Sequence, residues 1–522
     1  MLLHSLLSIS PLVISNLPPR TVTNPVLRRE DMSSRYRYLM PFVLCILSLS
    51  VQSCGGGAGQ TQETQVTQEV QETQAAISAV QPPIQQQAQV SASPQVLPSV
   101  EPQVQDSVQA QVQPTVQSQA RPEAQIQDQA PILSQAGQQP VGVNFKTNTL
   151  RRVGGSGDNW CQTWASDDSV ITAMDDGEWH TSEYKYHSRL YRITGQANNF
   201  NRSEVQNYPD YHTDGDGWFA YGVLSVDGVL YSLVSKTQTG AWSEGPFRGM
   251  KMLRSYDSGN SWYRVDRDNN DRFLDRWDIS RESLAPEEMF FMEEHGRFGS
   301  GKTAFPFSYA SFVQSGQDHR ASKDGYVYIY SPEGSDSHQL LLARVQPSQL
   351  GQRDAWQYFS GWNGSSPKWS SDIEDRQPNV ALPERNSRGE YFGWYSWLPS
   401  VVWNPGLQVY VMVNGGTYAG DQLSNSTSDY YNKWMHTKSG SLGLWYSETP
   451  YGPWKQFYYT DYWTADDPDN LTYLPKLSPK WISDDGRTMT LIWSDAMRNA
   501  QGYSHSINYL WNQMEIELVT SQ

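Results

Sequence analysis

The chain has 522 residues, of which 38% are hydrophobic and 18% charged, and its formal net charge is −16. Its 20 Trp and 30 Tyr exclude a fully disordered protein, and its acidity argues against nucleic acid or an anionic membrane surface as a partner. Three cysteines exclude both a disulfide-rich scaffold and a four-cysteine metal site.

The first 54 residues predict an export signal. From Met32, a short basic segment with Arg35 and Arg37 leads into the apolar run 39–51. This run of about 13 residues is too short to span a bilayer and suits a signal peptide. It ends in Val-Gln-Ser-Cys at Cys54, which resembles a bacterial lipobox. We expect translation to start at Met32 and Cys54 to be lipidated; the alternative is an ordinary cleaved signal.

Residues 55–140 predict a disordered linker. They are mostly Gln, Val, Pro, Ala, Ser and Thr, with no Lys, Trp, Tyr or Phe to build a core. The folded domain is therefore expected at 141–522, where 33 of the 39 basic and 46 of the 55 acidic residues give a net charge of −13. The predicted protein is an exported lipoprotein of the cell envelope or cell surface (periplasm or outer membrane), and only its lipid contacts the membrane.

Residues 141–522 repeat two kinds of β-rich unit in alternation. The first kind is a strand, a tight Gly or Asp turn and a second strand, as in GVLSVDGVLYSLV and PKWISDDGRTMTLIW. The second kind, as in KMLRSYDSGNSWYRV, follows each of the first. The pair recurs five times at a spacing of roughly 60–100 residues. We therefore predict an all-β, five-bladed β-propeller and a monomer; a β-sandwich or a β-solenoid is the alternative.

One segment of the second blade matches a known turn motif. The residues SYDSGNSW, from Ser255 to Trp262, match the Asp-box of sialidase-like propellers. Its aspartate and glycine close a turn between outer strands, and its tryptophan packs back on the sheet. We expect this turn to be structural and distant from any catalytic residue.

Several segments together resemble a glycosidase family. GDNWCQTWASDDSVITAMDDGEW, VDGVLYSLV, KDGYVYIYS, LLARV and YSETPYGPW occur in this order over nearly all of 150–520. The set is similar to glycoside hydrolase family 183, formerly domain-of-unknown-function family 4185, and more distantly to the five-bladed furanosidases of family 43. This resemblance implies endo-acting hydrolysis of D-arabinan.

Glycoside hydrolysis requires two carboxyl groups facing one bond. If residues 160–174 form a hairpin, Asp158 and Asp176 lie at the same edge of the first blade. The resemblance implies first-blade acids near these two positions. Asp175 is an adjacent alternative, but strand alternation directs neighbouring side chains to opposite faces. Both aspartates also lie beside glycine, where turn formation is a common role for Asp.

A third carboxyl group is expected to orient the sugar or to tune the acid. Glu390 is the preferred candidate, and Asp214 and Asp216 come next. The T-D-G-D-G segment around Asp216 is a turn or a weak structural calcium site, although it lacks the ligands of a full calcium loop. The nine His residues show no H-E-x-x-H or paired spacing, so we expect no catalytic metal and no cofactor.

Further side chains are predicted to bind substrate. Aromatic faces stack on the C–H faces of sugar rings, and polar side chains bind hydroxyl groups. The candidates are Trp160, Trp164, Trp394 and Trp397 near the acids, and Gln314, Asp318 and His319 in the loop of the third inner hairpin. The alternatives are packing between blades for the tryptophans and a surface position for the histidine.

The leading hypothesis is a surface-anchored glycoside hydrolase acting on an extracellular or cell-wall polysaccharide. One alternative is a propeller that binds a polysaccharide or oligosaccharide without cleaving it. The other is a polysaccharide lyase, which acts on uronates and typically needs Tyr, His and Arg or Lys near the sugar carboxylate.

Overall fold

The computed structural model describes 15 segments of the chain, all in the compact unit Pro122–Gln522: residues 138–179, 186–212, 218–236, 249–276, 288–292, 297–298, 302–303, 306–333, 336–383, 385, 387–389, 398–418, 438–468, 470–495 and 508–521. The predicted signal and nearly all of the predicted linker lie outside these residues. Within them, no helix is long and apolar enough to span a membrane.

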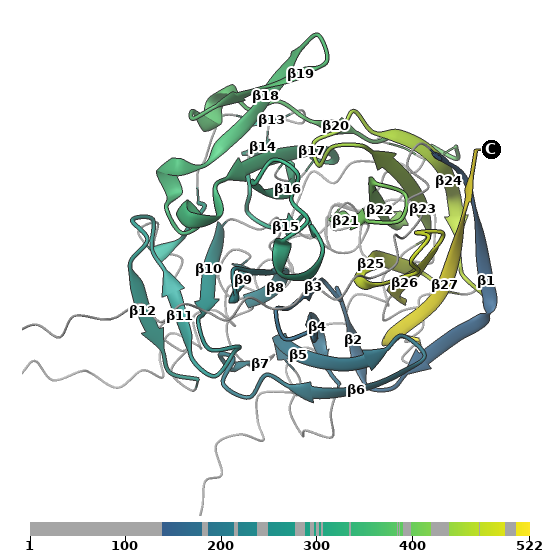
Figure 1. Ribbon diagram of the computed structural model, residues 1–522, viewed down its shortest axis with the longest axis horizontal. Coiled ribbons are helices and arrows are strands. Elements are labelled where there is room, and N and C mark those ends of the chain that lie inside the picture. Colours follow the sequence, from purple (N-terminus) through teal and green to yellow (C-terminus); the bar gives the residue numbers. More distant parts are fainter. Residues whose placement is uncertain are drawn as a thin grey trace, which may run out of the picture. The chain divides into compact units, whose positions relative to one another are not determined.

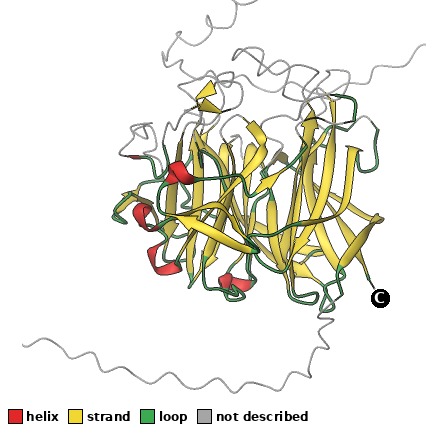
Figure 2. Ribbon diagram, turned by 90° about the horizontal axis from the view of Figure 1, so that it is seen from above, coloured by secondary structure: helices red, strands yellow, loops and turns green. Residues whose placement is uncertain are grey.

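Five antiparallel sheets are arranged around a central axis, in chain order, as a five-bladed β-propeller (Figure 1). Viewed from the side, nearly all of the regular structure is strand (Figure 2). The innermost strands of the five blades contact one another in ring order, β3 to β8, β15, β21, β25 and back to β3. The predicted fold is confirmed.

The strands are grouped by blade. The first blade contains β2 Ser156–Asp158, β3 Gln162–Trp164, β4 Val170–Glu178, β5 Tyr186–Gln196, β6 Asn199–Glu204 and β7 Tyr211–His212. The second contains β8 Trp218–Val226, β9 Val229–Lys236, β10 Gly249–Ser255, β11 Trp262–Val265 and β12 Asp271–Leu274. The third contains β15 Ser311–Phe312, β16 Val327–Glu333, β17 Asp336–Val345, β18 Gln357–Asn363, β19 Ser366–Ser370 and β20 Val380–Ala381.

The fourth blade contains β21 Ser400–Asn404, β22 Val409–Tyr418, β23 Lys438–Ser447 and β24 Lys455–Trp463. The fifth contains β25 Thr472–Ile482, β26 Thr488–Asp495, β27 Trp511–Thr520 and β1 Pro140–Val153. A separate small hairpin joins β13 Arg297–Phe298 to β14 Lys302–Thr303. The short 3₁₀ helices are Gln317–His319, Pro347–Gln349, Arg353–Ala355 and Ile373–Asp375.

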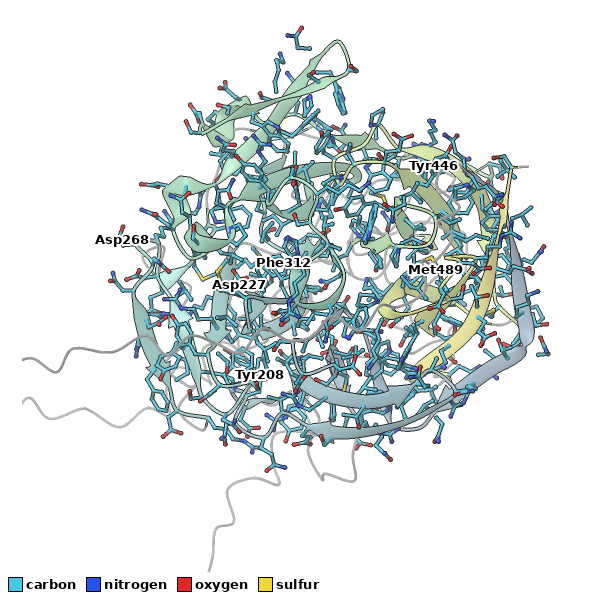
Figure 3. The ribbon with its side chains drawn as sticks, viewed as in Figure 1. Tyr208, Asp227, Asp268, Phe312, Tyr446 and Met489 are labelled. Carbon is cyan, nitrogen blue, oxygen red and sulfur yellow. The ribbon has the colours of Figure 1, made fainter. Side chains whose placement is uncertain are left out.

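Burial along the strands follows their distance from the axis. Every residue of β8 is buried, as expected for a strand covered on both faces, whereas β6 at the outside alternates between exposed and half-buried residues. Figure 3 shows Phe312 of β15 near the middle of the ring and Asp268 at its rim. The core consists of apolar clusters packed between these layers.

The N-terminal strand closes the ring. β1 pairs antiparallel with β27, the last strand of the chain, with Phe145 opposite Ile516. In Figure 1 the blue β1 lies along the yellow β27. The sequence predicted this last blade from C-terminal segments alone, and its outermost strand was missed. Closure between the two ends of the folded chain holds the first and last blades together without a disulfide.

The ring has two ends that matter for the site. We call the end where β8, β15, β21 and β25 begin the start end, and the opposite end, where the inner hairpins turn, the turn end. The loop 313–326 covers part of the turn end, because Gln317 donates to the carbonyl of Ala165 at 3.2 Å and Asp318 accepts from the amide of Gly228 at 3.0 Å.

The segment Ser255–Trp262 forms the turn between the outer strands β10 and β11. The Asp257 carboxylate accepts from the amide of Ser261 at 2.8 Å and from the Ser255 hydroxyl at 2.9 Å. Trp262 is fully buried and donates to the carbonyl of Gly259 at 3.1 Å. Asp257 therefore stabilises this turn, which lies in a part of the blade remote from the axis.

Candidate active site

Asp158 ends β2 at the start end of the ring and is 7% exposed. The hydroxyls of Tyr473 and Tyr509 both donate to its Oδ2, the second at 3.1 Å. Burial, and next the charge of Asp176, raise the pKa of Asp158 to about 8, although the two phenols oppose the rise. Asp158 is thus a carboxyl group that holds its proton near neutral pH, as a general acid must.

Asp176 lies opposite, on a bulge in β4. Asp158 pairs with Asp175, while Ser156 pairs with Glu178, so β4 has one extra residue between these pairs. Asp176 takes up the bulge with a left-handed φ of 48°. The next residue must be glycine, because a Cβ on Gly177 would lie 2.2 Å from the Ser156 carbonyl oxygen. The bulge re-aims the Asp176 side chain.

His187, at the start of β5, positions Asp176. Its Nδ1 lies 2.6 Å from Oδ1 of Asp176, and its ring packs on Phe219 with centroids 4.8 Å apart. The His187 side chain is 2% exposed, whereas the Asp176 side chain keeps 15% of its surface accessible. A buried partner therefore orients a carboxylate that still reaches the solvent. No local sequence pattern predicts this contact.

Strained backbone surrounds the Asp158 carboxyl. Asn159, Asp176 and Leu474 all adopt left-handed φ values, of 51°, 48° and 52°. The first breaks the inner strand between β2 and β3, and the other two lie in bulges of β4 and β25. Each such residue costs of the order of 1 kcal/mol or more and persists only where packing enforces it. Strain of this kind gathers at functional sites.

Asp175 joins the same cluster, which corrects the expectation that alternation would separate it from Asp176. The bulge breaks the alternation, and the charges of Asp176 and Asp158 both act on Asp175. Asp175 is 4% exposed, and its Oδ1 has no hydrogen-bond partner among the described residues. Burial, followed by the charges of Asp176 and Asp158, raises its pKa well above the ordinary value.

Tyrosines supply most of the polar groups around these carboxyls. Tyr473 and Tyr509 contact Asp158, and Tyr509 also lies 3.1 Å from the carbonyl oxygen of Asp176. Tyr221 of β8 is buried beside all three aspartates and packs against Tyr309, with ring centroids 5.6 Å apart. The phenols come from three other blades, so spacing along the sequence did not reveal them.

Two of the tryptophans predicted to stack on sugar do not contact the carboxyl cluster. Trp160 is fully buried between the first and last blades, with ring centroids 5.0 Å from Trp179 and 5.3 Å from Trp511. Trp164 ends β3 at the turn end, where its indole donates to Asp168 at 2.9 Å. The packing interpretation holds for Trp160, and Trp164 lies at the opposite end of the inner strand from Asp158.

The polar residues of the third inner hairpin are also structural. Gln314 is buried and donates to the carbonyl of Val223 at 2.9 Å. Asp318 accepts from Ser225 at 2.7 Å, and Nε2 of His319 lies 3.0 Å from the Tyr326 carbonyl oxygen. Asp318 and His319 lie at the turn end, because β15 runs from the start end toward it, whereas Gln314 pairs with Val402 in the middle of β21. These contacts fasten the loop, and a role of the three residues in substrate binding stays a prediction.

The remaining predicted residues lie outside the described part of the chain: Cys54, Asp214, Asp216, Glu390, Trp394 and Trp397. The T-D-G-D-G segment considered for calcium lies there too. Within the described residues, no group of three or more His, Cys, Asp or Glu side chains has the geometry of a metal site. Among the described residues, the acids of the carboxyl cluster are contacted by two phenols and a histidine.

No protein family model and no curated protein matches this chain. Among solved structures it is similar to a putative hydrolase from Bacteroides ovatus, with 11% identity over 70% of this chain and 87% of the other, at a TM-score of 0.39. It is also similar to the GH43_1 enzyme from Xanthomonas citri (10% identity, 75% and 95% covered, TM-score 0.35).

A third similar structure is an alpha-L-arabinofuranosidase from Podospora anserina, solved in complex with cellotriose (9% identity, 74% and 95% covered, TM-score 0.34). Identities and TM-scores this low carry no argument about activity. The assignment of five blades rests on the sheet topology of the chain itself.

Proposed function

We propose that the protein is a glycoside hydrolase in which Asp158 is the general acid and Asp176 its carboxylate partner. The observation that carries this proposal is the difference between the environments of two neighbouring carboxyl groups at the start end of the ring. Asp158 is buried and keeps its proton, while Asp176 is held by His187 and remains partly accessible. Two carboxyl groups whose surroundings differ in this way divide the acid and base roles of glycosidic cleavage.

The contacts of Asp158 specify where its proton goes. Both phenols donate to Oδ2, which leaves Oδ1 to hold the proton. From Oδ1 the proton passes to the glycosidic oxygen as the bond to the anomeric carbon breaks, and the leaving sugar departs as an alcohol. Asp176 acts on the anomeric carbon, either as the base that activates water or as the nucleophile. Water supplies the new hydroxyl in both cases.

The charges of the site favour hydrolysis over elimination from a uronate. The charge of Asp176 acts on both Asp158 and Asp175, and a substrate carboxylate placed beside Asp176 would be repelled by it. The described phenols that touch Asp158 donate to it, so neither is available as the base of a lyase. A neutral polysaccharide or oligosaccharide fits this environment best, and the family resemblance suggests D-arabinan.

We also propose that the chain is exported and anchored at the cell envelope through a lipid on Cys54. Support comes from the basic and apolar segments after Met32 and from the lipobox-like ending. Metabolic labelling with palmitate should mark the wild-type protein in the producing bacterium. The Cys54→Ser variant should stay unlabelled. Equal labelling of both proteins would refute lipidation at this residue.

The activity is tested on a panel of neutral and uronate polysaccharides that includes D-arabinan. Wild-type protein should release new reducing ends from a neutral polymer, without the unsaturated ends that a lyase leaves. The Asp176→Asn variant should lose at least about 100-fold in kcat on the same polymer. Unsaturated products, or an Asp176→Asn variant as active as wild type, would overturn the proposal.

A further inference from the structure

Three aromatic side chains form a row on the outer strands of the second blade. Phe273 lies on β12, Tyr263 on β11, and Tyr256 directly follows β10. Tyr263 pairs with Phe273 across the sheet, and directly opposite side chains share a face. The ring centroids of Tyr263 and Phe273 are 5.8 Å apart, and those of Tyr256 and Tyr263 are 5.9 Å apart. We call these three residues the aromatic row; in Figure 1 its strands lie at the outer edge of the ring.

The aromatic row is open to solvent. Phe273 is 60% exposed and Tyr256 is 52% exposed, while Tyr263 between them is half-buried. Among the described residues, the one other exposed aromatic side chain is Tyr462 of the fourth blade. Aromatic pairs across strands stabilise a sheet, but that role does not require their rings to face water. Exposed apolar side chains that gather on one face are typical of a binding surface.

Buried polar contacts hold one end of the aromatic row in place. Arg254 is 7% exposed, and its guanidinium lies 5.2 Å from the ring centroid of Tyr256. Arg254 donates to one oxygen of the Asp271 carboxylate at 2.6 Å, and the Tyr256 hydroxyl donates to the other at 2.8 Å. The Tyr256 ring is therefore fixed before any ligand arrives. A surface that is already rigid loses little conformational entropy on binding.

The charges around the aromatic row favour a neutral ligand. Asp271 compensates the charge of Arg254, and Arg272, next to Phe273, pairs with Glu288 at 3.7 Å. The folded domain as a whole carries a net charge of −13, which repels polyanions. Aromatic faces bind the C–H faces of sugar rings without any charge. A neutral sugar chain is the polymer that this chemistry fits.

The geometry of the aromatic row favours a single chain. Successive rings are separated by a distance comparable to the length of one sugar in an extended polysaccharide. The planes of Tyr256 and Tyr263 are inclined by 59°, and those of Tyr263 and Phe273 by 71°. Such rings form a stepped surface, which suits a chain that twists from one sugar to the next. A flat crystalline polymer would need coplanar rings.

We propose that the aromatic row is a second glycan-binding surface, which holds a single chain of a neutral polysaccharide on the outside of the second blade. It is separate from the carboxyl cluster, because β10, β11 and β12 are the outer strands of their blade. The choice of a neutral polysaccharide as ligand rests on the proposed function, whereas the binding itself requires no cleavage. A polymer held on this surface stays close to the protein, which raises its effective concentration at the carboxyl cluster.

The first test is electrophoresis in native gels that contain D-arabinan, arabinoxylan or, as the anionic comparison, polygalacturonate. At least one neutral polymer should retard wild-type protein. Tyr256→Ala and Phe273→Ala should weaken binding of that polymer about 3- to 10-fold. Tyr462→Ala is the matched control, because Tyr462 is 47% exposed on another blade, and it should be retarded like wild type. Migration of wild type that neither neutral polymer changes overturns the inference, as does equal retardation of wild type and the two folded variants.

The second test separates stacking on a flat ring from general apolar contact. Phe273→Leu keeps an apolar side chain at this position and removes the ring, so it should weaken retardation as much as Phe273→Ala. Phe273→Trp keeps a flat ring and should retain or strengthen it. Equal retardation of the leucine and tryptophan variants overturns the inference.

A second copy of the chain is the other occupant that such a face could have. Sedimentation velocity without polymer should show a monomer for both wild type and Phe273→Ala, and a wild-type dimer that Phe273→Ala dissociates would overturn the inference. The proposed function fails separately. If the aromatic row binds polymer but no polymer is cleaved, hydrolysis is refuted and this surface stands; cleavage without any effect of Tyr256→Ala or Phe273→Ala on retardation refutes this surface alone.

Discussion

Replacing Asp158 by Asn should make the protein more stable at neutral and alkaline pH. The folded protein raises the pKa of Asp158 from 3.8 to about 8, mainly by burial. Above the unfolded pKa, the unfolded chain releases this proton while the folded protein still binds it. Stability therefore falls as pH rises between these two values, because the folded state binds more protons throughout that window. Asparagine cannot ionise, so the variant escapes this penalty.

The size of the effect follows from the shift. Each pH unit in the window should cost wild type about 1.4 kcal/mol of unfolding free energy relative to the variant. Over a shift of about four units, the difference reaches the order of 5 kcal/mol near pH 8 and vanishes near pH 4. The amide oxygen of asparagine can still accept from Tyr473 and Tyr509, so the surrounding contacts should remain.

The assay is denaturant unfolding of both proteins at several pH values across this window. Asp354→Asn is the control, because Asp354 is exposed on the third blade and the substitution should leave the unfolding free energy nearly unchanged. If Asp158→Asn followed the wild-type curve at every pH, Asp158 would not hold its proton in the folded state. Its assignment as the general acid would then fail.

Three further predictions concern neighbouring parts of the fold. His187→Asn should lower kcat about 10-fold or more, because the Asp176 side chain loses the contact that orients it. Circular dichroism should confirm that the variant is folded, and an unchanged kcat would show that His187 has no role in the site. Trp160→Ala should lower the unfolding free energy by about 3–5 kcal/mol in denaturant titrations, whereas a loss below about 1 kcal/mol would contradict its place in the core. Asp318→Ala should cost about 1–3 kcal/mol of stability yet keep kcat/KM, and a KM defect in the folded variant would restore its predicted role in substrate binding.

The sequence predicted the blades because each consists of short-range hairpins. The alternation of apolar residues and the Gly and Asp turns are local signals, and the strands pair with their neighbours along the chain. The closing strand β1 was missed for the opposite reason. It pairs with β27 at the far end of the domain, as Lys146 with Glu515, and no local pattern records such a partner.

The hairpin argument predicted the proximity of Asp158 and Asp176, whose catalytic roles stay a prediction. Asp158 and Asp176 do come together across β2 and β4, within one electrostatically linked cluster. Asp175 was set aside because strict alternation was assumed, and the bulge at Asp176 removes that assumption. His187 and Tyr473 were missed, since packing between different strands brings them to the carboxyls.

Trp160 shows the limit of arguing from proximity in sequence. It lies two residues from Asp158, yet the break in the inner strand at Asn159 separates their surroundings. Asp158 accepts hydrogen bonds from phenols near the axis. Trp160 instead packs in an apolar cluster between blades, and its indole donates to Ser494 at 3.0 Å. A left-handed residue between two positions cannot be anticipated from alternation alone.

The central claim is that Asp158 delivers a proton to a glycosidic bond, and one paired measurement tests it most directly. On a polymer that wild type cleaves, binding and turnover of Asp158→Asn are measured side by side, by calorimetry and by release of reducing ends. The account predicts that affinity stays within a few-fold of wild type while kcat falls by about 100-fold to 10,000-fold. Turnover by Asp158→Asn at the wild-type rate would contradict it.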